Sequence, residues 1–160
     1  MAAGAFTLDA SEIAAFGTKA LAAAARAPQE YGQAGREAGL AVQRYGQAFI
    51  PVDTGAAKAQ TTMESVTVTA SSVTVIVSSR ATSATGFPYP IVLETGRGAI
   101  EAKPGRVLVF PGKDGKTVFT KRVKAYAGNQ FMTRAMETAK PYIEARVDKA
   151  TQRLIDWLVS

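Results

Sequence analysis

The five residues Pro51-Val52-Asp53-Thr54-Gly55 divide this 160-residue chain into two kinds of sequence. Before them the sequence is rich in Ala and favours helices, and after them, up to about residue 125, it is rich in Val, Thr and Ser and favours strands. Pro51 has no backbone donor and ends the preceding helix. Asp53 and Thr54 can cap a new turn, and Gly55 tolerates backbone angles that other residues avoid. We therefore expect a structural joint between a helical region and a sheet.

The composition removes several kinds of chemistry. The chain contains no Cys and no His, which excludes disulfides, zinc fingers, thiol nucleophiles and imidazole acid–base catalysis. Its length favours a single domain over residues 1–160. No run of about 18 apolar residues is present, and the start lacks the basic and apolar parts of a signal peptide.

The first 50 residues predict two helices, within residues 1–27 and 28–50. The first is dominated by Ala, and Pro28 suits the first turn of the second. The second helix has one apolar face, but four glycines weaken it by about 1 kcal/mol each relative to Ala. These glycines also allow close approach, either of another part of this chain or of another subunit; they are Gly32, Gly35, Gly39 and Gly46.

The middle of the chain predicts antiparallel strands. Val alternates with Thr or Ser on both sides of Ser71-Ser72, which indicates a hairpin, and Asp114-Gly115 is a turn signal within a second hairpin at residues 107–124. Residues 81–90 predict a long exposed loop, and the apolar run at residues 91–93 adds a short strand.

The end of the chain predicts a long helix. Its apolar residues recur at steps of three and four over residues 129–159, Asn129 can cap it, and Pro141 should kink or split it. The expected fold is therefore α+β: an antiparallel sheet of about four to five strands at residues 51–125, packed by a long N-terminal helix and a long C-terminal helix.

One segment carries the whole charge imbalance of the chain. Its net charge is +6, and residues 103–124 hold seven of the 19 Lys and Arg against a single acid, whereas the rest of the chain is neutral. Three interpretations remain open: a solvated edge hairpin, a docking surface for an acidic protein, or a contact with nucleic-acid phosphates. The basic residues are Lys103, Arg106, Lys113, Lys116, Lys121, Arg122 and Lys124.

No catalytic constellation stands out. Gly115-Lys116-Thr117 is similar to the end of a phosphate-binding loop, but the motif needs a Gly where Phe110 stands and a helix where strand-forming residues follow. Glu94 is the best single acid–base candidate, because it follows an apolar run and precedes a turn. We favour a structural role for it, in which it accepts backbone donors of the Thr95-Gly96 turn. No pair of acids has a spacing that suggests paired chemistry.

Three separated motifs resemble the small neck proteins of long-tailed bacteriophages, the tail-component proteins that complete the tail and join it to the head. Residues 51–58 (PVDTGAAK) are similar to the family's PVDTG-small-hydrophobic-basic signature. Residues 89–96 (YPIVLETG) resemble its Tyr-Ala…Glu-aromatic-Gly-Thr segment, with a different order and with Pro90 in place of the small residue. Residues 130–136 (QFMTRAM) resemble the opening of its last helix, without the two family prolines.

The resemblance covers roughly residues 28–158 and implies a structural virion protein rather than an enzyme. It implies a homo-oligomeric ring, expected to be a hexamer, which assembles in the host cytoplasm and sits in the virion between the capsid connector and the tail tube. It brings no catalytic residue, cofactor, metal or membrane, and genomic DNA would pass through the channel. The expected structural motif consists of Pro51, Asp53, Thr54, Gly55, Glu94, Gly96 and Phe131.

The expected partner surface combines the 81–90 loop with the basic hairpin. Its residues are Phe87, Tyr89, Arg106, Lys113, Lys116, Lys121, Arg122 and Lys124. Three alternatives stay open: a tail-terminator ring subunit, a small basic nucleic-acid-binding protein, and a small hydrolase or transferase that depends on Glu94.

Overall fold

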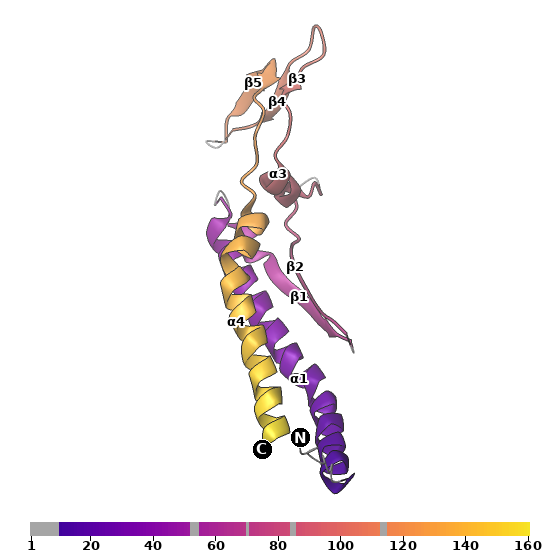
Figure 1. Cartoon of the computed structure of the whole chain (residues 1–160). Coiled ribbons are helices and arrows are strands. Elements are labelled where there is room, and N and C mark those ends of the chain that lie inside the picture. Colours follow the sequence, from indigo (N-terminus) through magenta and orange to yellow (C-terminus); the bar gives the residue numbers. More distant parts are fainter. Residues whose placement is uncertain (1–9, 52–54, 70, 84–85, 113–114) are drawn as a thin grey trace, which may run out of the picture.

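Two long antiparallel helices form the body of the protein (Figure 1). The structure is a computed structural model that describes residues 10–51, 55–69, 71–83, 86–112 and 115–160. Helix α1 spans Ala10–Phe49, and helix α4 spans Phe131–Val159. We call this helix pair the rod.

Helix α1 continues through Pro28, so the prediction of two separate helices was wrong. A proline inside a helix costs about 3 kcal/mol because it removes one hydrogen bond and crowds the preceding turn. Contacts with α4 on both sides of Pro28 hold α1 together: the Arg26 guanidinium lies 4.9 Å from the Trp157 ring centroid, and Arg153 pairs with Glu30 at 3.0 Å. Helix α4 likewise passes through Pro141 without being split. Both prolines are exposed, so their rings do not disturb the packed faces.

The glycine face of α1 receives a β-hairpin of the same chain. Strand β1, Thr61–Val68, pairs antiparallel with β2, Val73–Ser79, as the alternating Val pattern predicts. A Cβ atom at Gly35 would lie 2.6 Å from Val73 Cγ1, and one at Gly39 would lie 2.5 Å from Met63 Sδ. Of the two uses expected for these glycines, the structure therefore shows the contact within the chain.

The described residues on either side of positions 52–54 agree with the predicted end of one helix and start of a new turn. Helix α1 ends at Phe49, two residues before Pro51, and Gly55 adopts φ 78° at the start of the short helix α2, Ala56–Ala59. Asp53 and Thr54 lie outside the described residues. Phe131, at the start of α4, is 1% exposed. It packs in a core cluster with Ala81 and with Ile50 and Ala57, which lie on either side of residues 51–55.

The core between the helices is built from small side chains. Val42, Ala135 and Ala139 form a second buried cluster, and Met132, Ile143 and Phe49 are among the partly buried residues that surround it. Because Ala has almost no side-chain entropy to lose and allows helices to approach closely, such a core suits a long, thin rod.

The expected sheet of four to five strands is not confirmed. The described residues contain three separate two-stranded sheets. Besides the β1–β2 hairpin, β4 (Leu108–Pro111) pairs with β5 (Thr117–Thr120), and β3 (Ile100–Glu101) pairs with β6 (Arg122–Val123). The second hairpin is thus confirmed, but it lies at the far end of the molecule from the tip of β1–β2 and shares no sheet with it (Figure 1).

The apolar run at residues 91–93 is helical, which corrects the predicted strand. Helix α3 spans Tyr89–Thr95, begins with Pro at one of its first positions, and ends at Gly96, which has φ 81°. A Pro in the first turn and a Gly after the last are the usual boundaries of a short helix. The segment at residues 81–90 is also less open than predicted, because Ala81 is fully buried and Pro90 is buried within α3.

Candidate functional site

The basic hairpin belongs to a small β unit that projects from one end of the rod (Figure 1). We call residues 97–126 the head. Arg97 and Tyr126 close its base through two backbone hydrogen bonds of 2.7 and 2.9 Å. Strands β3, β4, β5 and β6 form the rest of it.

The head exposes apolar side chains on both faces of its β4–β5 hairpin. Val109 and Phe119 face each other across the two strands and are 56% and 67% exposed. Phe110 and Val118 are the next pair, on the opposite face, and are 37% and 36% exposed. An isolated two-stranded hairpin is marginally stable in water, and it gains stability when a further strand or a helix covers it. The head therefore has the character of a surface that another element covers.

Positive charge surrounds these apolar residues. Among the described residues of the head, Glu101 is the one carboxylate, and its pair with Arg122 at 3.4 Å is solvent-exposed and contributes little. Lys103, Arg106 and Lys121 line one hollow of about 340 Å³ beside the Gly105 turn. Of the predicted interface residues, the head brings together Arg106, Lys116, Lys121, Arg122 and Lys124, all exposed, whereas Lys113 lies outside the described residues.

The other two predicted interface residues lie apart from the head, near α3. Phe87 is 53% exposed. Tyr89 packs against the core cluster of Ile50 and Phe131, and its hydroxyl is buried without a hydrogen-bond partner among the described residues. Tyr89 therefore acts mainly as a core residue, in contrast to Phe87.

Glu94 caps the first turn of α4 from a different helix. Its carboxylate accepts hydrogen bonds from the Met132 amide at 2.8 Å, the Thr133 amide at 3.0 Å and the Thr133 hydroxyl at 2.6 Å. Partial burial raises the pKa of Glu94, but the bonds from the Thr133 hydroxyl and the two amides outweigh it and lower the pKa below the usual value. A carboxylate held ionised by helix amides is a poor general acid, so the geometry favours the structural role. The donors come from α4 and not from the predicted Thr95-Gly96 turn.

Two glycines make the joint between α3 and α4 possible. Gly96 and Gly128 have φ values of 81° and 82°, and a Cβ at Gly96 would lie 2.3 Å from the Tyr126 carbonyl oxygen. The Asn129 amide donates to the Leu93 carbonyl at 2.6 Å. The side chain of Asn129, predicted as the cap of α4, instead donates to the Phe49 carbonyl at the end of α1 at 2.8 Å. This joint fixes the base of the head to the rod.

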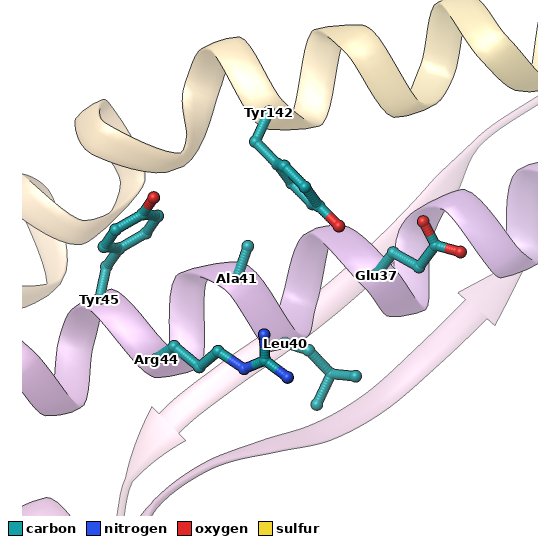
Figure 2. A pocket seen from close by; sticks show the side chains of 6 residues that line it. All are labelled: Glu37, Leu40, Ala41, Arg44, Tyr45 and Tyr142. Carbon is teal, nitrogen blue, oxygen red and sulfur yellow. The ribbon is translucent and has the colours of Figure 1, made fainter.

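A groove on the rod is the feature that the sequence did not indicate. Figure 2 shows Tyr142 pointing from α4 across to α1, Tyr45 rising from α1 toward α4, and Arg44 running along α1 beside Leu40. The groove has a volume of about 340 Å³, and Leu40 on its rim is 41% exposed. Tyr and Arg are enriched at protein interfaces. Only the packing of α1 on α4 brings Tyr45 and Tyr142 together, so no local sequence pattern could have shown this groove.

The groove does not form an acid–base site. Its carboxylate, Glu37, is paired with Arg146 at 3.1 Å and accepts a hydrogen bond from Gln33 at 3.1 Å. Arg146 in turn lies 4.7 Å from the centroid of the Tyr142 ring. Across the part of the chain that the structure describes, no group of three or more Asp and Glu side chains could hold a metal ion.

None of the described helices is long and apolar enough to cross a membrane. The chain matches no protein-family model, no curated protein and no solved structure.

Proposed function

We propose that this chain is a structural subunit of the neck of a long-tailed bacteriophage, where it forms a homo-oligomeric ring that joins the capsid connector to the tail. The observation that carries the proposal is the head, a hairpin with apolar side chains on both faces and a marked excess of positive charge. Such a surface gains stability when a partner covers it. The three motifs that resemble phage neck proteins support this particular kind of assembly.

The position of two of these motifs agrees with a structural role. The PVDTG string follows α1, and Glu94 fastens α3 to α4. A stiff rod, a fixed joint and an exposed head are the parts that an assembly subunit needs.

The experiment is a joining assay. Filled capsids and free tails are prepared from a phage whose copy of this gene carries a nonsense codon, and the purified chain is added back. We expect joined, infectious particles and a ring-sized mass for the chain. A chain that stays monomeric at every concentration and does not join capsids to tails contradicts the proposal.

The same preparation separates the two neck roles. If the chain is a tail-terminator subunit, tails made without it will have irregular lengths, because nothing stops growth of the tube. If it joins heads to tails, the free tails will have a uniform length.

The basic head makes nucleic-acid binding the rival function. Three adjacent cations, Lys121, Arg122 and Lys124, are exposed there. Affinity for duplex DNA at physiological salt that disappears when all three are changed to Glu would favour this rival.

A further inference from the structure

The outer face of α4 carries a stripe of side chains that the rod leaves unused. Glu137, Glu144, Asp148 and Ile155 recur at steps of seven, four and seven residues, so they lie within about 40° of one another around the helix. This direction is opposite to that of the buried Ala residues of α4. All four are exposed, and Ile155 is 45% exposed. We call these four residues the outer stripe.

The carboxylates of the outer stripe have no partner among the described residues. The acids of α1 that face α4 are engaged, since Glu30 pairs with Arg153 and Glu37 pairs with Arg146. The outer stripe therefore holds three negative charges without an ion pair among the described residues, and Lys140 and Arg134 lie on its two flanks.

The head and the outer stripe are complementary in charge and comparable in length. The head offers exposed cations around a hollow, and it also carries the exposed Val109 and Phe119. The stripe offers three carboxylates within the twelve residues 137–148, which is about 18 Å of helix, and its exposed Ile155 extends it. A strand of four residues spans about 13 Å. The head points away from its own rod, so it does not cover the stripe of the same chain (Figure 1).

We propose that the head of one copy docks on the outer stripe of α4 of a second copy. Cations of the head meet the three carboxylates, and the exposed apolar residues of both surfaces are covered together. Because head and stripe are different surfaces, the contact is heterologous, and repeated contacts close into a ring or grow into a filament. This inference rests on the proposed neck function, for which it supplies the subunit contact.

The test is a charge exchange between the two surfaces. One variant reverses the hollow of the head (Lys103→Glu, Arg106→Glu, Lys121→Glu), and a second reverses the stripe (Glu137→Lys, Glu144→Lys, Asp148→Lys). A matched control reverses three exposed cations elsewhere (Lys19→Glu, Arg36→Glu, Lys58→Glu), which changes the net charge as much as the head variant does. Sedimentation velocity gives the mass of each at several protein and salt concentrations, and circular dichroism checks the fold.

We expect the wild type and the control to assemble, and each surface variant to associate at least about 100-fold more weakly, because like charges then face each other. An equimolar mixture of the two surface variants should assemble again, since each supplies the surface that the other needs. Should a triple variant fail to fold, the single changes Arg106→Glu and Glu144→Lys give the same comparison with a smaller effect.

Three results would overturn the docking contact. Both surface variants could assemble like the control, or the head variant could lose assembly while the stripe variant keeps it. The third result is a mixture of the two surface variants that stays dissociated. A head variant that keeps its mass but loses affinity for duplex DNA would identify the head as a nucleic-acid surface. If the wild type assembles and joins capsids to tails while the variants do so equally well, only the docking contact is wrong. If the wild type neither assembles nor joins them, the neck function fails as well.

Discussion

The contact between the glycine face of α1 and the β1–β2 hairpin can be measured with two substitutions of the same kind. Gly35→Ala and Gly17→Ala both replace glycine by alanine inside α1, so both gain about 1 kcal/mol of helix propensity. At Gly17 nothing lies within 4 Å of the added Cβ. At Gly35 the added Cβ would lie 2.6 Å from Val73 Cγ1 and 3.4 Å from Val66 Cγ1. The difference between the two variants therefore reports the packing of the hairpin alone.

The expected difference follows from the size of the overlap. Carbon atoms pack best at about 3.5–4.0 Å, so the hairpin must move by about 1 Å, and Val73 cannot turn away easily because its side chain is branched at Cβ. Overpacking of this kind typically costs about 1–3 kcal/mol. We expect Gly17→Ala to raise the free energy of unfolding by up to about 1 kcal/mol. The free energy of unfolding of Gly35→Ala should be about 1–3 kcal/mol lower than that of Gly17→Ala.

Urea denaturation at one fixed protein concentration measures both values, provided that the slopes of the two transitions agree. In a protein of this size the difference corresponds to about 2–4 °C in melting temperature for each kcal/mol. If Gly35→Ala is as stabilising as Gly17→Ala, within about 0.5 kcal/mol, the hairpin does not approach α1 as closely as described.

Three further predictions concern a cap, an ion pair and the head. Glu94→Gln should lower the free energy of unfolding by about 1 kcal/mol at neutral pH. Because the folded pKa of Glu94 is lowered, this loss should shrink as the pH falls below its usual value of 4.5; a deficit that stays constant in denaturant titrations down to pH 3 would contradict the cap. Hydrogen bonds from Arg80 at 2.5 and 2.7 Å, together with one from Ser78, lower the pKa of Glu64 to about 2. The Glu64 carboxyl carbon should therefore titrate near pH 2 by NMR, and nearer pH 4.5 in Arg80→Ala. A wild-type midpoint near pH 4.5 would refute the ion pair between Arg80 and Glu64. Phe119→Ser should prevent assembly in sedimentation experiments and leave the thermal unfolding of the rod unchanged, because the ring is 67% exposed, whereas lower rod stability would show that Phe119 supports the fold.

The regular elements could be predicted because their patterns are local. The alternation of Val with Thr predicts the β1–β2 hairpin, and apolar residues at steps of three and four predict α4. The end of α1 before Pro51 follows from the restriction that proline places on its neighbours. These signals need only the residues that form the element.

The pairing of the strands could not be predicted, because it depends on contacts between distant segments. Alternation identifies a strand but does not name its neighbour, and so the two hairpins were placed in one sheet. Residues 91–93 are branched and apolar, which favours a strand, yet they form part of a helix. The proline at its start favours the helix, and so does the hydrogen bond from the Asn129 amide to the Leu93 carbonyl near its end. This hydrogen bond joins segments far apart in the sequence, so the local sequence does not predict it.

The candidate site was predictable in composition but not in geometry. The excess of Lys and Arg at residues 103–124 was evident from the sequence, and the head keeps the described members of that cluster exposed. Glu94 accepts hydrogen bonds from backbone amides, as the sequence predicts. The amides belong to residues 132 and 133 and not to the Thr95-Gly96 turn. The groove between Tyr45 and Tyr142 depends on the register of α1 against α4, which no single segment contains.

The closure of the head at Arg97 and Tyr126 also has an evolutionary consequence. Because one backbone pair brings both ends of the head together, the head has the form of an insertion into a helix–hairpin–helix scaffold, and insertions whose ends are close are well tolerated. Recombination at these two positions can exchange one head for another of different length or charge. The rod, whose core depends on small and tightly matched side chains, would then stay constant while the exposed surface of the head changes.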